Sequence, residues 1–198
     1  METAFTEVPR LTFRIAPESM EMFTSLLQSG ILTPTAPGNS IGVFLENIQG
    51  FTTDYITSQV QTIFLDGTAT DDMETKFAGE NPVLALSAAM PGLAGAIFRK
   101  NSLHAALRTT KIARHDACGN SRITVTLKLF NTIARDRGPE LLRQGVSLKA
   151  AGLKSFLDAR TTLPSMIMVA ELEGKTIPRH DLPKTLTSLD RVHLTLID

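Results

Sequence analysis

The sequence predicts an α+β fold with two units, each a mixed sheet that carries one main helix on one face. Two observations predict it. In Ile123–Phe130 and in Arg191–Ile197, apolar and polar residues alternate, which is the period of two that half-buried strands show. Between these strands, the apolar positions of 148–159 recur at about 3.6 residues, as on the buried face of an amphipathic helix.

The second half of the chain shows the order of elements most clearly. We expect a strand at 123–130, a polar turn at 135–139 and a return strand at 141–147. A helix that Ser147 caps should follow at 148–159, then a third strand at 166–172 and a last strand at 191–197. One helix packed on one face of such a mixed sheet is the β-grasp arrangement.

This order of elements resembles that of the small sulfur carriers ThiS and MoaD, the latter being the small subunit of molybdopterin synthase. The segments that carry the resemblance are 125–130, 147–157, 169–174 and 190–196. The resemblance implies a ubiquitin-like β-grasp fold and a link to sulfur transfer or to the molybdenum or tungsten cofactor.

The first half of the chain repeats the pattern. Residues 61–67 match 168–174, and Val83–Ser87 matches 192–196. Two matches at similar spacing indicate an internal tandem repeat.

The other elements of the first repeat are expected upstream of these matches. They are a strand at 11–16, a divergent insertion near 17–38 and a helix at 40–48. Asn39 or Ser40 can cap that helix. The insertion accommodates either a short helix over 20–27 or a second strand.

The predicted organisation therefore has three parts. A first β-grasp unit spans 1–95, a basic connecting segment spans 96–122, and a second, ThiS/MoaD-like unit spans 123–198.

Charge is distributed unevenly, although the formal net charge of the chain is zero. Residues 1–95 hold 3 basic and 11 acidic side chains, and residues 96–122 hold 6 basic and 1 acidic. Opposite signs favour contact between these parts, within one chain or between two.

The connecting segment is too apolar for a free linker. Leaving Ile97, Phe98, Leu103 and Leu107 in water would forfeit burial energy, so we expect this segment to pack on a sheet or on a second chain. Its basic side chains are candidate ligands for an anion, such as a phosphate group. They are Arg99, Lys100, Arg108 and Arg114.

Two glycines follow the last expected strand of the first repeat. The resemblance to ThiS and MoaD implies a C-terminal Gly-Gly tail that carries the sulfur. This sequence instead closes with Thr195-Leu-Ile-Asp198. We therefore expect the carrier chemistry not to transfer to that end. Gly92 and Gly95 stand where the tail of the first repeat would be, but they would need proteolysis to act as one, and turn positions explain them more simply.

Other chemistry is disfavoured. His115 and Cys118 have a spacing found among metal ligands, but a structural zinc site needs four ligands, so no metal site is expected. A single cysteine excludes an internal disulfide and a four-cysteine iron–sulfur cluster. No catalytic triad or phosphate-binding loop is found, and no aromatic ladder favours nucleic acid.

Location follows from the same composition. No apolar run approaches the ~20 residues that span a membrane, and no signal peptide begins the sequence. A reducing, cytoplasmic setting is expected.

These observations favour a non-catalytic protein-interaction module over an enzyme. We expect it to bind a protein partner, or a second copy, through its sheet edges or its exposed sheet face, and to need no cofactor. The alternative is a small-molecule protein, or an enzyme, that holds an anionic ligand with the basic segment 99–114.

Overall fold

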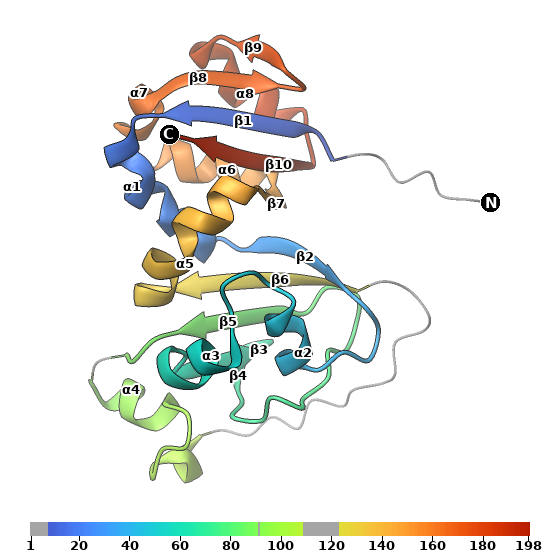
Figure 1. Ribbon diagram of the computed structural model, residues 1–198, viewed down its shortest axis with the longest axis vertical. Coiled ribbons are helices and arrows are strands. Elements are labelled where there is room, and N and C mark those ends of the chain that lie inside the picture. Colours follow the sequence, from blue (N-terminus) through green and yellow to red (C-terminus); the bar gives the residue numbers. More distant parts are fainter. Residues whose placement is uncertain (1–7, 91, 109–122) are drawn as a thin grey trace, which may run out of the picture. The chain divides into compact units, whose positions relative to one another are not determined.

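The computed structural model describes residues 8–90, 92–108 and 123–198. Two five-stranded mixed sheets, each accompanied by helices, make up the fold (Figure 1). The predicted α+β class is confirmed. In the part of the chain that the structure describes, no helix has the length and apolar content to cross a membrane.

The two compact units are not successive halves of the chain. Unit 1 consists of the residues before Gly30 together with Gly138–Asp198, and unit 2 is Gly30–Arg137. This division differs from the boundaries expected from the repeat, because the strand expected to open each repeat lies in the sheet of the other half.

Unit 2 is built on the strand order β2-β6-β5-β3-β4. Its strands are β2 (Ile31–Thr35), β3 (Thr62–Leu65), β4 (Thr68–Ala69), β5 (Val83–Ser87) and β6 (Ile123–Phe130). The central pair, β5 and β6, is parallel, and the other neighbours are antiparallel. Its helices are α2 (Ile41–Glu46), α3 (Thr53–Gln59) and α4 (Gly92–Phe98), with a 3-10 turn at Ala105–Leu107.

One face of this sheet forms the core of unit 2. Ile123, Val125, Leu127 and Leu129 of β6 are at most 1% exposed, whereas the residues between them and Phe130 are half-buried on the other face. Buried Phe44 and Ile56 from α2 and α3 complete the core. Ser40 and Thr52 cap these helices with their side-chain oxygens, as expected for N-cap residues.

Unit 1 has the order β7-β10-β1-β8-β9. Its strands are β1 (Arg10–Ile15), β7 (Val146–Lys149), β8 (Ile167–Leu172), β9 (Lys175–Ile177) and β10 (Arg191–Ile197). Here β1 and β10 form the parallel central pair, and the other neighbours are antiparallel.

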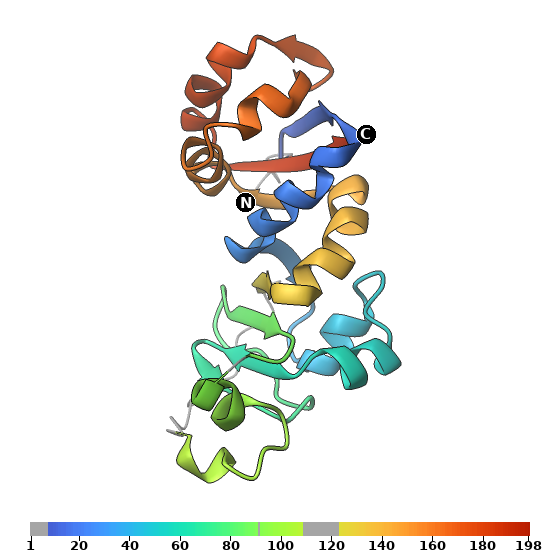
Figure 2. The same ribbon diagram turned by 90° about the vertical axis from the view of Figure 1, so that its left-hand side faces the viewer.

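Helices of unit 1 gather on the buried face of its sheet. They are α1 (Met20–Thr24), α6 (Ala150–Asp158), α7 (Leu163–Met166) and α8 (Leu182–Thr187), with 3-10 turns at Pro17–Ser19, Ser25–Gln28 and Arg179–Asp181. Phe23 of α1 meets Phe156 of α6 with ring centroids 6.2 Å apart. Alternate residues Leu11, Phe13 and Ile15 of β1 are fully buried in the same core. Figure 2 shows the helices of this unit beside its strands from a second direction.

The same arrangement of a hairpin turn and two hydrogen bonds, which we call the backbone clamp, occurs once in each sheet. Asp66 and Glu173 have φ values of 50° and each precedes a glycine of positive φ, the conformation of a type I′ hairpin turn. The side-chain Oδ1 of Asp66 accepts a hydrogen bond of 2.8 Å from the N–H of Val83, and the N–H of Asp66 donates one of 2.9 Å to the carbonyl of Val83. Glu173 does the same with Arg10, at 2.5 and 2.9 Å. The start of β1 is therefore equivalent to the start of β5.

This equivalence corrects the matching of the repeat. The sequence pairs Val83–Ser87 with the last strand, whereas β5 corresponds in space to β1, and β10 corresponds to β6. The physical reason is that both central strands of each sheet run parallel and share the same alternation, so their patterns do not distinguish their places in the sheet.

Most expected elements are present, and one stretch is wrong. The turn at 135–139 and the strand at 141–147 are replaced by α5 (Asn131–Gln144) and by β7. Ile133, Ala134, Leu141 and Leu142 are all buried, and their 3.6-residue spacing favours the helix despite Pro139.

Two further expectations concern helix starts. Ser147 lies in β7 and caps no helix, and α6 begins only at Ala150. The insertion at 17–38 contains both of its alternatives, the short helix α1 and the strand β2.

Candidate functional site

An apolar cavity lies on the open face of the unit 2 sheet. Phe64, Ala85 and Lys128 are aligned across β3, β5 and β6. With Val83, Met90 and Phe130 they line a cavity of about 570 Å³. Volumes of this size and apolar walls are typical of ligand or anchor-residue pockets.

The far end of this cavity is polar. Asn131 follows β6 with a φ of 53°, a conformation that asparagine tolerates better than most residues. Its Nδ2 donates a hydrogen bond of 2.9 Å to Ser87 Oγ, which is buried. Lys128 adds a positive charge to the lining. The cavity therefore suits an apolar group that ends in a polar or negative one.

In its described part, residues 96–108, the basic segment contacts β3 and the residue before it. The ring of Phe98 lies 5.3 Å from that of Phe64, and the N–H of Lys100 donates to Gln61 O at 2.6 Å. Leu103 and Leu107 do not pack on this chain, since they are 98% and 67% exposed. Phe98 thus provides an aromatic contact of this segment, and these two leucines remain at the surface.

Three of the predicted anion ligands bind acceptors of the protein itself. Arg108 Nη1 pairs with Asp71 Oδ1 at 2.8 Å, and its other nitrogens donate to the carbonyls of Ile97 and Arg99. Arg99 Nε donates to Gln61 Oε1 at 3.1 Å.

Lys100 is similarly occupied. Its Nζ donates to the carbonyl of Ile56 at 3.2 Å, and burial lowers its pKa. Arg114 lies outside the described residues. The pairing of Arg108 with Asp71 agrees with the expected contact between the basic segment and the acidic first half.

Gly92 and Gly95 both lie in helix α4. Gly92 has a φ of 77°, which glycine adopts readily. A side chain at Gly95 would collide with the carbonyl of Met90, so glycine permits a close approach of the backbone there. The backbone conformation at Gly92 and the close approach at Gly95 account for glycine at both positions.

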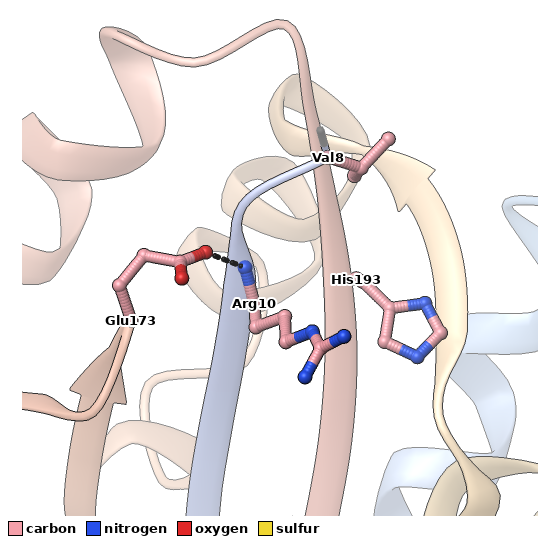
Figure 3. A pocket seen from close by; sticks show the side chains of 4 residues that line it. All are labelled: Val8, Arg10, Glu173 and His193. Carbon is pink, nitrogen blue, oxygen red and sulfur yellow. Dashed lines mark hydrogen bonds between the residues drawn. The ribbon is translucent and has the colours of Figure 1, made fainter. Parts of the chain in front are cut away.

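A second cavity, of about 520 Å³, lies on the open face of the unit 1 sheet (Figure 3). Val8, Arg10, Glu173 and His193 line it. Arg10 and His193 are neighbours across the parallel pair β1–β10. Glu173 Oε1 accepts the 2.5 Å hydrogen bond from Arg10 N that Figure 3 draws.

His193 is held in place by the edge strand. Its Nδ1 lies 3.1 Å from Ser147 Oγ, and Nε2 lies so near Gly145 that a side chain at that position would collide with it. Burial and the positive charge of Arg10 lower the pKa of His193. The imidazole is therefore mainly neutral at pH 7.

Sequence reasoning missed this cavity. In the sequence, the alternation of 191–197 places His193 on the polar side of a strand, where nothing local distinguishes it from an ordinary surface residue. Arg10 and His193 are far apart in the sequence, and only the β1–β10 pairing brings them together.

Within residues 8–90, 92–108 and 123–198, no group of three or more His, Cys, Asp or Glu side chains is arranged to hold a metal ion. His115 and Cys118 lie outside the described residues.

Comparison with known proteins finds no match: no family model, no curated protein and no solved structure matches this chain.

Proposed function

We propose that the protein is a non-catalytic, ubiquitin-like binding module that engages a protein partner through the open sheet face of unit 2. The observation that carries this proposal is the apolar cavity lined by Phe64, Ala85 and Phe130. A sheet face that presents aromatic and aliphatic side chains around a hollow suits an anchoring side chain of a partner.

Exposed leucines in the same unit support this reading. Leu93, Leu103 and Leu107 are all more than 60% exposed, on the segment that packs beside β3. Exposed apolar side chains that form a patch mark interaction surfaces. The preferred anchor is apolar, with an acidic neighbour that pairs with Lys128.

The pathway is proposed from the resemblance to ThiS and MoaD. A partner in molybdenum- or tungsten-cofactor synthesis or in sulfur transfer fits it, with the β-grasp unit serving as a docking surface without carrier chemistry. A second copy of the chain that pairs through an edge strand such as β2 or β4 is the other form of the same proposal.

A cavity-filling substitution tests the site. In Ala85→Phe a ring fills the hollow without disturbing a buried residue, because Ala85 is half-buried on the open face. Thr124→Phe is the matched control, since Thr124 lies on the same face of β6 opposite Pro34 and outside the cavity lining.

The assay is affinity capture with quantitative mass spectrometry, followed by reconstitution of the captured partner with purified protein. Binding that the wild type and Thr124→Phe share, and that Ala85→Phe loses at least tenfold, supports the proposal. Equal binding by Ala85→Phe would contradict it. Size-exclusion chromatography of the purified chain distinguishes self-association from a separate partner.

A small-molecule function is the second candidate, and the volume of the same cavity favours it. Ser87 and Asn131 at one end, with Lys128 in the lining, suit a carboxylate attached to an apolar body. The basic segment 99–114 is a weaker basis for such a ligand, because Arg99, Lys100 and Arg108 already bind protein acceptors. A compound that copurifies with the wild type and not with Ala85→Phe would favour this candidate.

A further inference from the structure

We propose that the open face of the unit 1 sheet is a binding site for a phosphate group of a small molecule, held at Arg10 and His193. This site is independent of the apolar cavity in unit 2. Figure 3 shows the Arg10 and His193 side chains next to each other on one side of the sheet. The cavity that they line is open and of about 520 Å³.

Strand register concentrates positive charge around this cavity. His193 pairs with Arg10 on one side and with Ser147 on the other. Two residues earlier on β10, Arg191 pairs with Lys149, and both are exposed. Residues two apart on a strand lie on the same face, and diagonal neighbours are about 7–8 Å apart. Long basic side chains at these positions reach a common anion.

Arg10 is available to such an anion. Its guanidinium makes no hydrogen bond or ion pair with any residue of the described part of the chain, whereas its main-chain N–H is bound by Glu173. A guanidinium presents a planar fork of donors that matches phosphate oxygens. The arginine is thus positioned by its backbone and leaves its side chain for a ligand.

The nearby carboxylates limit where the anion can lie. Glu173 lines the cavity on the β8 side and uses one oxygen to hold Arg10 N. Glu171 lies further along β8, opposite Thr12. An anion is therefore attracted to the β10 side of Arg10, over His193 and toward Arg191 and Lys149.

His193 couples anion binding to protonation. The charged groups that face it are Arg10 from β1, Arg191 from β10 and Lys149 from β7, with Glu173 beyond Arg10. The positive charges of these neighbours destabilise the protonated form of His193, and a bound dianion offsets this repulsion. Binding therefore raises the pKa of His193, and affinity increases as pH falls.

Sulfate is the first probe, because it stays dianionic across the pH range in which histidine titrates. The full-length chain is followed by NMR of its histidine Cε1–H groups, with His193→Gln identifying the His193 resonance. The pH titration is made in chloride and in sulfate at matched ionic strength. We expect sulfate to raise the pKa of His193 by about 0.5 or more, with the other three histidines unchanged.

Two arginine variants test the assigned residue. Arg10→Gln removes the fork and should abolish the effect of sulfate. Arg14→Gln is the matched control, since Arg14 is exposed on the same face of the same strand but pairs with Ile197, and it should keep the effect. Both positions are exposed, so neither change disturbs the core.

The outcomes are distinct. A response of His193 that equals that of the other histidines, or that persists in Arg10→Gln, would overturn the proposal. Inorganic phosphate and acetate at equal concentration then identify the chemical class. Phosphate should perturb His193 at concentrations at least tenfold lower than acetate does, and an equal response to acetate would overturn the assignment to phosphate.

Discussion

Leu196 provides the sharpest test of how unit 1 is held together. It is 1% exposed on β10, in register with Phe13 of β1. Leu196→Ala removes about three methylene equivalents at about 0.8 kcal/mol each, and the cavity left behind raises the cost to about 3 kcal/mol. For a chain of this length, a loss of this size in the free energy of unfolding lowers the midpoint of thermal unfolding by roughly 6–12 °C.

Ile197→Ala is the matched control, because Ile197 is adjacent and 41% exposed. Its expected cost is below about 1 kcal/mol. Far-UV circular dichroism follows both units, while fluorescence of Tyr55, the sole tyrosine in a chain without tryptophan, follows unit 2. If Leu196→Ala left the dichroism midpoint equal to that of Ile197→Ala, the assignment of Leu196 to the core of unit 1 would be refuted.

Three further predictions test other parts of the fold. Phe98→Asp should expose residues 92–108 to hydrogen exchange more than Arg99→Ala does, because the ring contact with Phe64 outweighs an exposed hydrogen bond; equal protection in the two variants would contradict this. Gly145→Ala should lower the free energy of unfolding by about 1 kcal/mol or more, because its φ is 99° and a side chain would strike His193; a neutral effect in urea unfolding would argue against that contact. His193 has a lowered pKa, so the unfolded chain binds a proton more readily and stability should fall as pH drops below about 6.5. His193→Gln should flatten that part of the stability–pH profile.

Periodicity in the sequence was sufficient to predict most of the local structure. Alternation located β6 and β10, and the apolar spacing of 148–159 located α6. It failed at α5, where Pro139 and charged residues resemble a turn but buried Leu141 and Leu142 require a helix. A helix with many charged and polar residues contributes a weak hydrophobic pattern, and tertiary packing decides whether it forms.

Strand pairing could not be derived from the same patterns. Parallel neighbours such as β1 and β10 share one alternation, and nothing local to either strand specifies which sheet it joins. For this reason Arg10 and His193 were not recognised as neighbours. The apolar cavity was missed for a related reason: Phe64, Ala85 and Lys128 come from three strands whose order had first to be known.

The backbone clamp explains how one architecture presents two different surfaces. Because Asp66 holds Val83 as Glu173 holds Arg10, Val83 and Arg10 occupy equivalent places on their sheets. In unit 2 this place is an apolar wall, and in unit 1 it is a cation beside His193. The turns and the core conserve geometry between the units, since changing them would cost buried area or turn conformation. The open faces carry no such constraint, so the chemical difference between the units is concentrated where a ligand or partner can meet it.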